Sequence, residues 1–180
     1  MGKNLIFTEK EAEFLRELVR QKVDFMIVGL SAAALQGAPV VTQDVDLWFK
    51  DLEQPGIRKA LKKVGGSYIP SIALNPPMFE GESVNLFDVV VHMHGLAEFD
   101  EEKRRSIKIP LGRVKVAVLA LEQIVRSKKA TGRAKDKLVL PVLLDALATV
   151  GKAGGNRTSP PPSAFKAEAA RRTRGPRVRR

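Results

Sequence analysis

The sequence predicts an α/β (α+β) fold in which a small mixed β-sheet is flanked by helices and followed by a helical C-terminal part. Short apolar runs typical of strands occur at 24–28, 44–50 and 84–93. Stretches with apolar residues three and four positions apart lie before, between and after these runs, as in amphipathic helices. With 180 residues, 44% hydrophobic and 28% charged, the chain is long enough to enclose a core.

The first half of the chain is expected to alternate helices and strands. Thr8 and Glu11 have the spacing of a capping box, which opens a helix with an apolar stripe. Gly37 ends a short helix, and Pro55 suits the first position of another. The predicted elements are a helix over 9–22, a strand over 24–28, a short helix over 31–36, a strand over 44–50 and a helix over 55–64.

The second half contains one Pro-interrupted segment and several clearer elements. Residues 68–81 are expected to form a strand fragment followed by a loop. Pro110 is confined to the edge or the turn of a hairpin, and Pro141 either kinks the last helix or starts a new one. The remaining predicted elements are a strand over 84–93, a helix over 96–105, a hairpin of 107–109 with 114–116, and helices over 118–129 and 135–150.

The positive charge is concentrated at the C-terminal end. Residues 151–180 carry nine Lys or Arg and one Glu, so they account for +8 of the net charge of +11 and leave +3 for residues 1–150. Their Gly, Pro, Ser and Arg bias predicts a basic disordered tail after a folded domain over 1–150. The tail is interpreted as a solvated end, with salt-sensitive attraction to RNA, DNA or acidic surfaces as the alternative.

The chain is expected to be cytoplasmic and to have no membrane partner. No apolar run approaches the roughly 20 residues that span a bilayer, and the apolar patch in MGKNLIFTEK is too short for a signal peptide. The absence of cysteine excludes disulfides and thiolate metal ligands.

An Asp-x-Asp pair gives the first functional hypothesis. Asp44 and Asp46 are two apart on a predicted strand, so both carboxylates project from one face. Like charges repel, and an unpaired buried carboxylate is costly, so this pair favours a bound cation. Oxygen ligands on a rigid element suit Mg²⁺, which completes its shell with water and substrate phosphates. The motif alone is weak because it also occurs by chance.

The order of the surrounding elements strengthens this hypothesis. The first strand ends at Gly29, and Ser31 lies near the start of the following helix, where backbone N–H groups can bind an anion such as a triphosphate. A tight turn with a helix cap is the alternative for both residues. Asp88 lies in the apolar run 86–91, and a strand beside the Asp-x-Asp strand would bring it to the same ions. A strand-end Asp held by local N–H groups is the alternative.

Three other features are open to two interpretations each. His92 and His94 resemble metal ligands, but without a clear third partner they are interpreted as lining a strand end or solvent. Lys128 and Lys129 lie in the basic segment RSKKATGRAKD, which either lays cations along phosphates or forms a solvated helix end. Trp48 shares the face of the acids and either flanks a base or packs in the core.

These residues resemble the nucleotidyltransferases of the DNA polymerase β superfamily, with the abortive-infection AbiEii-like toxins and uncharacterised bacterial nucleotidyltransferases looking most alike. The family pattern is a strand, a Gly followed by Gly or Ser, a spacer, Asp-hydrophobic-Asp-hydrophobic, and a third acid on a later strand. In this chain the pattern reads V28-G29-L30-S31, D44-V45-D46-L47 and Asp88. The chain departs from it at Leu30, and the likeness covers about residues 20–148.

The resemblance implies a nucleotidyltransferase fold and transfer of a nucleoside monophosphate from an NTP to an acceptor hydroxyl. Asp44, Asp46 and Asp88 would hold two Mg²⁺ ions, at the ~3.5–4 Å spacing of two-metal sites. Asp88 completes the second ion's shell or takes the acceptor proton. The predicted phosphate-binding residues are Gly29, Ser31, Lys128 and Lys129.

The acceptor is left open between RNA such as tRNA, a protein side chain and a small molecule. The resemblance also raises a toxin role with a cognate antitoxin protein as partner. The alternative function is a catalytically degenerate member of the fold that binds RNA or a partner through its basic tail.

Overall fold

The computed structural model describes residues 7–72 and 75–153, and side chains up to residue 150. The tail predicted over 151–180 therefore lies outside the described side chains. The helices are α1 (Glu9–Arg20), α2 (Gly29–Leu35), α3 (Pro55–Lys63), α4 (Phe99–Arg105), α5 (Leu121–Thr131) and α6 (Ala134–Ala153). The strands are β1 (Phe25–Ile27), β2 (Val45–Phe49), β3 (Ser67–Ile69), β4 (Met78–Glu80), β5 (Phe87–Val90), β6 (Ile107–Leu111) and β7 (Val114–Val118).

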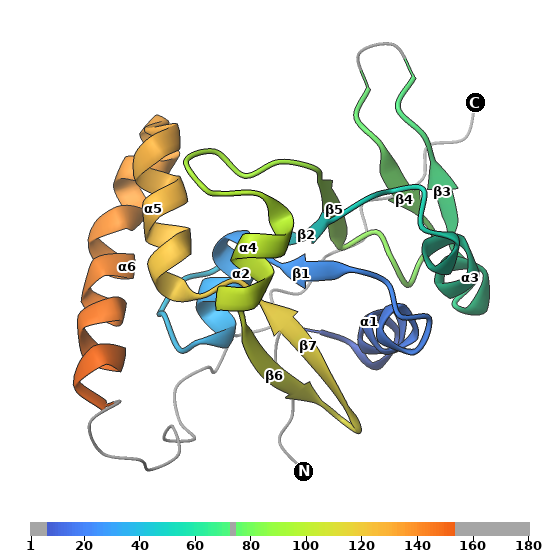
Figure 1. Cartoon of the computed structure of the whole chain (residues 1–180), viewed down its shortest axis with the longest axis horizontal. Helices are drawn as coiled ribbons and strands as arrows, with labels where there is room; N and C mark the ends of the chain where they lie inside the picture. Colours follow the sequence, from blue (N-terminus) through green and yellow to red (C-terminus); the bar gives the residue numbers. More distant parts are fainter. Residues whose placement is uncertain (1–6, 73–74, 154–180) are drawn as a thin grey trace, which may run out of the picture.

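The main sheet is mixed and has the strand order β5-β2-β1-β7-β6. Strand β1 pairs antiparallel with β2 and parallel with β7, while β2 pairs parallel with β5. A separate hairpin of β3 and β4 projects beyond the β5 edge, away from the α5–α6 pair (Figure 1). The fold therefore places the acidic strands β2 and β5 between the helical pair and the hairpin.

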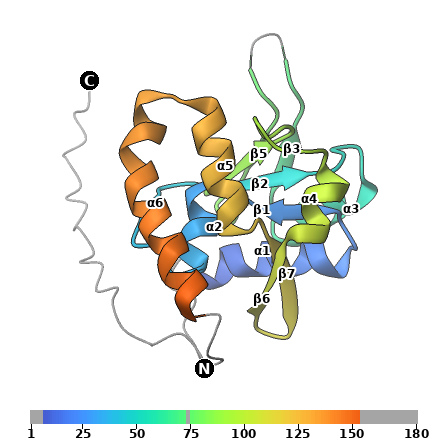
Figure 2. The same cartoon turned by 60° about the vertical axis from the view of Figure 1, so that its left-hand side comes forward.

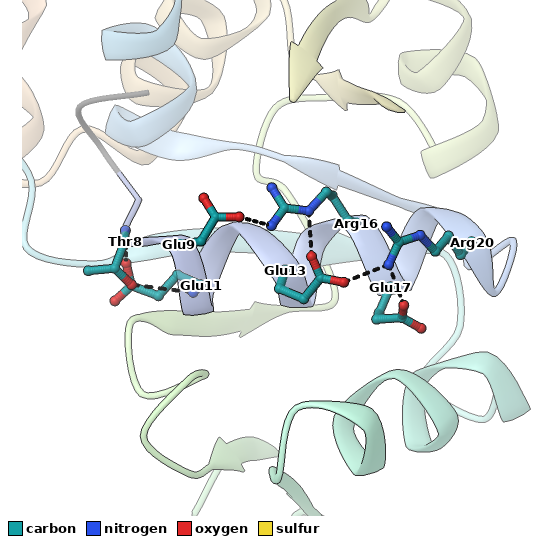
Figure 3. A network of polar contacts seen from close by, with 7 residues as sticks. All are labelled: Thr8, Glu9, Glu11, Glu13, Arg16, Glu17 and Arg20. Atoms are coloured by element: carbon teal, nitrogen blue, oxygen red, sulfur yellow. Dashed lines mark hydrogen bonds and ion pairs between the residues drawn. The ribbon is translucent and has the colours of Figure 1, made fainter. Parts of the chain in front are cut away.

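Helix α1 begins where the sequence predicts because both halves of the capping box form. The Glu11 amide donates to the Thr8 hydroxyl, and the Glu11 carboxylate accepts from the Thr8 amide. Arg16 and Arg20 both donate to Glu13, at 2.6 Å each (Figure 3). The same arginines also pair with Glu9 and Glu17, respectively. These ion pairs are partly open to solvent, since Arg20 and Glu9 are exposed, and pairs in contact with water stabilise a helix only modestly.

Aromatic side chains join the hairpin to the main sheet. The ring of Phe79 in β4 lies 5.5 Å from that of Phe14 in α1 and 5.8 Å from that of Phe49 in β2, both edge to face. Phe14 also contacts Phe87 at the start of β5, at 5.3 Å. All four rings are buried, and aromatic pairs at such distances add to the stability from burial alone.

Helices α5 and α6 lie side by side, as Figure 2 shows after the turn from the view of Figure 1. Gly132, in the left-handed conformation, ends α5 and allows the chain to reverse into α6. Pro141 lies inside α6, so the last helix continues through the proline and no new helix starts there. No helix of the described residues is long and apolar enough to span a bilayer.

The predicted fold class is confirmed, and the differences are mainly in the bounds. The strand expected over 84–93 is only four residues long, because a turn precedes it and a loop carrying His92 and His94 follows it. The Pro-interrupted segment forms the two strands of a hairpin instead of one fragment, with Tyr68 paired with Phe79. The hairpin of β6 and β7 is longer than predicted, because Pro110 lies on the edge strand, where no partner needs its missing N–H.

Candidate active site

Asp46 and Asp88 are direct neighbours across the pairing of β2 with β5. The two strands are parallel, and their register places the Cα atoms of Asp46 and Asp88 opposite each other. Residues opposite each other on neighbouring strands project from the same face of the sheet. The structure therefore brings together two carboxylates that are 42 positions apart in the chain.

Gly29 lies against the Asp46 carboxylate. The amide of Val28 donates to the carbonyl of Asp46 at 2.9 Å, which extends the β1–β2 ladder up to Gly29. Gly29 then turns with a φ of +66°, and a Cβ built on it would come within 2.0 Å of Asp46 Oδ2. Any side chain at this position would be strained by its backbone conformation and would displace the carboxylate. A glycine at position 29 is thus needed to make room for the Asp46 carboxylate.

The electrostatics of the two acids reflect their proximity. Burial is the main cause that raises the pKa of Asp46, and the negative charges of Asp88 and Asp44 raise it further, while Lys128 opposes the rise. The pKa of Asp88 is raised by partial desolvation and then by Asp44. Asp44 itself is exposed just before β2 and lies near enough to influence both. The three predicted acids therefore lie close enough at the start of β2 and β5 for their charges to interact.

A cavity of about 270 Å³ opens on one side of Asp46, and we call it the basic cavity. Its wall combines Gly29 and Asp46 from the sheet side with Lys128 of α5 and Arg133 after it. The loop after β5 contributes His92, Met93 and His94. Cationic side chains and the Asp46 carboxylate therefore line the same cavity.

Asp136 holds the two cations of this wall in place. It is 1% exposed, and its carboxylate accepts from Lys128 Nζ at 2.9 Å and from Arg133 Nε at 2.8 Å. Burial would raise the pKa of Asp136, but the hydrogen bonds from Arg133 and Lys128 outweigh it and lower that pKa. The resemblance of the segment LEQIVRSKKATGRAKD implied that its Asp lies by the active site, but Asp136 was not among the predicted catalytic, metal or phosphate-binding residues. The sequence signal that could have identified this residue is an acid three positions after an arginine, at the start of a helix.

The structure separates the predicted phosphate-binding residues. Gly29 and Lys128 line the basic cavity, whereas Lys129 is exposed and does not line it. Ser31 is fully buried, and its hydroxyl donates to the Val28 carbonyl at 2.9 Å, so it holds the turn and does not face the cavity. Leu30 packs partly buried against the core and does not line the cavity.

Two aromatic groups near the acids take different roles. Trp48 is buried at 3% exposure and packs edge to face on Phe99 at 5.4 Å, so the packing alternative holds for it. His92 and His94 are exposed, with ring centroids 5.3 Å apart, and both line the basic cavity. Their loop packs on α5, since a Cβ on Gly95 would come within 2.3 Å of Ala130 Cβ.

The donor set suits a hard cation. Carboxylate oxygens are the ligands that Mg²⁺ prefers, and two like charges held in register are stabilised by a cation. Within the part of the chain that the structure describes, no three His, Asp or Glu side chains form a ready group that could hold a metal ion. Asp46 and Asp88 therefore offer an incomplete shell, of the kind that Mg²⁺ completes with water and substrate oxygens.

Comparison by sequence finds no matching protein-family model and no matching curated protein. Comparison of structures finds similarity to a crystal structure of ANT(2″)-Ia in complex with adenylyl-2″-tobramycin, with a TM-score of 0.51 and 13% identity, over 77% of this chain and 88% of that one. Two further matches have lower TM-scores. The solution structure of ANT(2″)-Ia gives 0.45 with 12% identity, over 82% of this chain and 96% of that one. An antigenic nucleotidyltransferase-like protein from Paracoccidioides brasiliensis gives 0.48 with 16% identity, over 79% and 78%.

The chain therefore has a nucleotidyltransferase fold. Its mixed sheet with helices around it is similar to the structure of ANT(2″)-Ia over most of both chains. At 13% identity this likeness concerns the fold, and the activity has to be argued from the site.

Proposed function

We propose that this protein is a Mg²⁺-dependent nucleotidyltransferase that moves a nucleoside monophosphate from an NTP to an acceptor hydroxyl and releases pyrophosphate. The observation that carries the proposal is the register pairing of Asp46 with Asp88 beside Gly29. The Asp46 carboxylate adjoins a cavity that Lys128 and Arg133 also line, so the site offers negative charge for a metal ion and positive charge for the phosphates of a triphosphate.

In this proposal the basic cavity holds the triphosphate. Lys128, fixed by Asp136, balances the charge that develops on the leaving pyrophosphate. Asp46 and Asp88, with Asp44 beside them, would hold Mg²⁺, which when bound would neutralise part of the charge of the phosphates. His92 and His94 would contact the nucleotide from the loop after β5.

Asp88 would receive the proton of the acceptor hydroxyl. Its carboxylate is exposed next to Asp46, so an acceptor hydroxyl can approach it. The acceptor oxygen then forms a bond to the α-phosphorus, and the bond from that phosphorus to the oxygen bridging to the β-phosphate breaks. The electron pair of that bond leaves with pyrophosphate, so no oxidant or other co-reactant is needed.

The test incubates the full chain with each α-³²P-labelled NTP and Mg²⁺, with total RNA, a small-molecule extract or no addition. Asp46→Asn and Asp88→Asn should each lower transfer of label by about 10²–10³-fold, the usual loss when one electrostatic group of an active site is removed. Asp145→Asn is the matched control, because Asp145 is exposed on α6 and far along the chain from the acids. Full transfer by Asp46→Asn would refute the proposal.

The toxin role is a finer part of the same proposal. It follows from the resemblance to the AbiEii-like branch and predicts that expression of the wild-type chain slows growth of a bacterial host. The Asp46→Asn variant, expressed to the same level, should leave growth unchanged. Equal growth inhibition by both variants would separate toxicity from nucleotidyl transfer.

A further inference from the structure

A second cavity, of about 530 Å³, is lined by both Asp46 and Asp88, and we call it the apolar cavity. Asp46 lines both cavities, whereas Asp88 lines only this one. The basic cavity is lined by Lys128 and Arg133, whereas the apolar cavity is lined mainly by apolar side chains and the two carboxylates. The volume is in the range of small-molecule sites.

The hairpin of β3 and β4 supplies the apolar wall. Ile69 and Met78 are cross-strand partners there, and Ile72 follows β3. Ile72 is 61% exposed and Met78 50% exposed, although both are large apolar side chains. Large apolar side chains that are exposed around one cavity indicate a surface that a ligand covers.

Positive charge is missing from the described wall. None of the described residues that line the apolar cavity is Lys, Arg or His. The hairpin's own cation contact is on its other face. Tyr68, next to Ile69, points to the opposite side of the strand, and Arg58 lies 5.0 Å over its ring. A polyanion in this cavity would meet carboxylates and hydrocarbon without cations to balance its phosphates.

We infer that the apolar cavity binds the acceptor, and that the acceptor is a small alcohol with an apolar aliphatic or aromatic body. This inference rests on the proposed function, which requires an acceptor hydroxyl next to Asp88. The hydroxyl reaches the acidic pair while the body covers Ile72 and Met78. RNA and acidic small molecules are the excluded acceptors.

Methionine methyl groups report on each cavity separately. Met78 lines the apolar cavity, Met93 lines the basic cavity, and Met26 is fully buried in the core. The test records NMR spectra of the full chain with ¹³C-labelled methionine methyl groups, assigned through Met78→Leu and Met93→Leu. The probes are 1-butanol, 1-hexanol, 6-hydroxyhexanoate and a short single-stranded RNA, each in the absence of nucleotide.

The alcohols should shift the Met78 methyl signal and leave Met26 unchanged. The dissociation constant should fall by about fourfold per added methylene from 1-butanol to 1-hexanol, the gain expected from burying each group. The acid 6-hydroxyhexanoate should bind at least about tenfold more weakly than 1-hexanol, because its carboxylate would be desolvated without a partner. RNA should not shift Met78. Equal binding of the acid and the alcohol, a Met78 response to RNA, or no response to the alcohols would each overturn the inference.

A charge placed on the wall gives a matched test. Ile72→Lys should abolish the preference for 1-hexanol over 6-hydroxyhexanoate, whereas Ile107→Lys, an exposed isoleucine on β6, should keep it. An unchanged preference in Ile72→Lys would place the alcohol elsewhere and overturn the inference.

Nucleotide binding is scored separately, through the shift of Met93 on addition of ATP with Mg²⁺. If Met93 does not respond while Met78 follows the alcohol series, the proposed function fails and the apolar cavity stands as an alcohol site. If Met93 responds and Met78 does not, the proposed function stands and the acceptor class is wrong.

Discussion

Replacing Gly29 by alanine gives the sharpest test of how the site is built. The added Cβ would lie 2.0 Å from Asp46 Oδ2, so the oxygen must move by about 1.4 Å to reach 3.4 Å, where ordinary van der Waals contact begins. A misplacement of about 1 Å in an active site is enough to cost about 10²-fold in rate. The left-handed φ of +66° adds a backbone cost of about 1–2 kcal/mol for an L-residue.

Gly65→Ala separates these two effects. Gly65 has a φ of +73°, but a Cβ there would meet nothing within 4 Å. Both variants should therefore lose similar backbone stability, about 1–2 kcal/mol, or about 2–8 °C in Tm for a chain of this size. The loss of function should be specific to Gly29→Ala.

The assay measures Tm by circular dichroism and the Mg²⁺-dependent affinity for mant-ATP by fluorescence. Gly29→Ala should lower that affinity at least about tenfold, as expected when the orientation of a metal ligand is disturbed, and lower transfer of label by about 10²-fold. Gly65→Ala should bind mant-ATP like the wild type. If Gly29→Ala, folded, binds and transfers as well as Gly65→Ala, the contact with Asp46 has no functional meaning and the reasoning fails.

Two further predictions concern stability. Asp136→Asn should lower the free energy of unfolding at neutral pH by about 2–3 kcal/mol, because Lys128 and Arg133 lose a charged acceptor. Folding lowers the pKa of Asp136, so its contribution is present above the pKa of the unfolded state and is lost as pH falls through the lower folded value. Urea titrations from pH 7 downward should show the two proteins converging in acid, and a constant gap would contradict this. Thr8→Ala should remove the capping box with Glu11 and lower stability by about 1 kcal/mol, or about 2–4 °C in Tm, and an unchanged Tm in thermal melts would show that the cap contributes nothing.

Local signals predicted most of the helices and strands. The capping box at Thr8 and the proline at Pro55 mark the starts of α1 and α3 because they act through neighbouring backbone groups. The hairpin of β3 and β4 was underestimated, since its strands are three residues long and are held by Phe79, whose partners are distant in the chain. The continuity of α6 through Pro141 also depends on packing against α5, which a local rule on proline does not include.

The candidate site was predicted in part. The Asp-x-Asp spacing, the glycine and the later acid point to three stretches, and Asp46, Asp88 and Gly29 do lie together. Whether they bind Mg²⁺ and nucleotide stays a prediction. The choice between Lys128 and Lys129 could not be made from the sequence, because neighbours on a helix point in directions that only the docking of α5 decides.

The sequence by itself determined the alternation of helices and strands and the acids that one strand projects from one face, because both depend on contacts between near neighbours in the chain. Only the tertiary structure decided that β5 pairs with β2 in the register that joins Asp88 to Asp46, and that Asp136 anchors the basic wall. It also decided that the apolar side chains of the β3–β4 hairpin and the cations Lys128 and Arg133 line two different cavities that share Asp46. Strand register and helix docking depend on the burial of side chains that are far apart in the sequence. A local sequence pattern does not indicate which distant residues pack together.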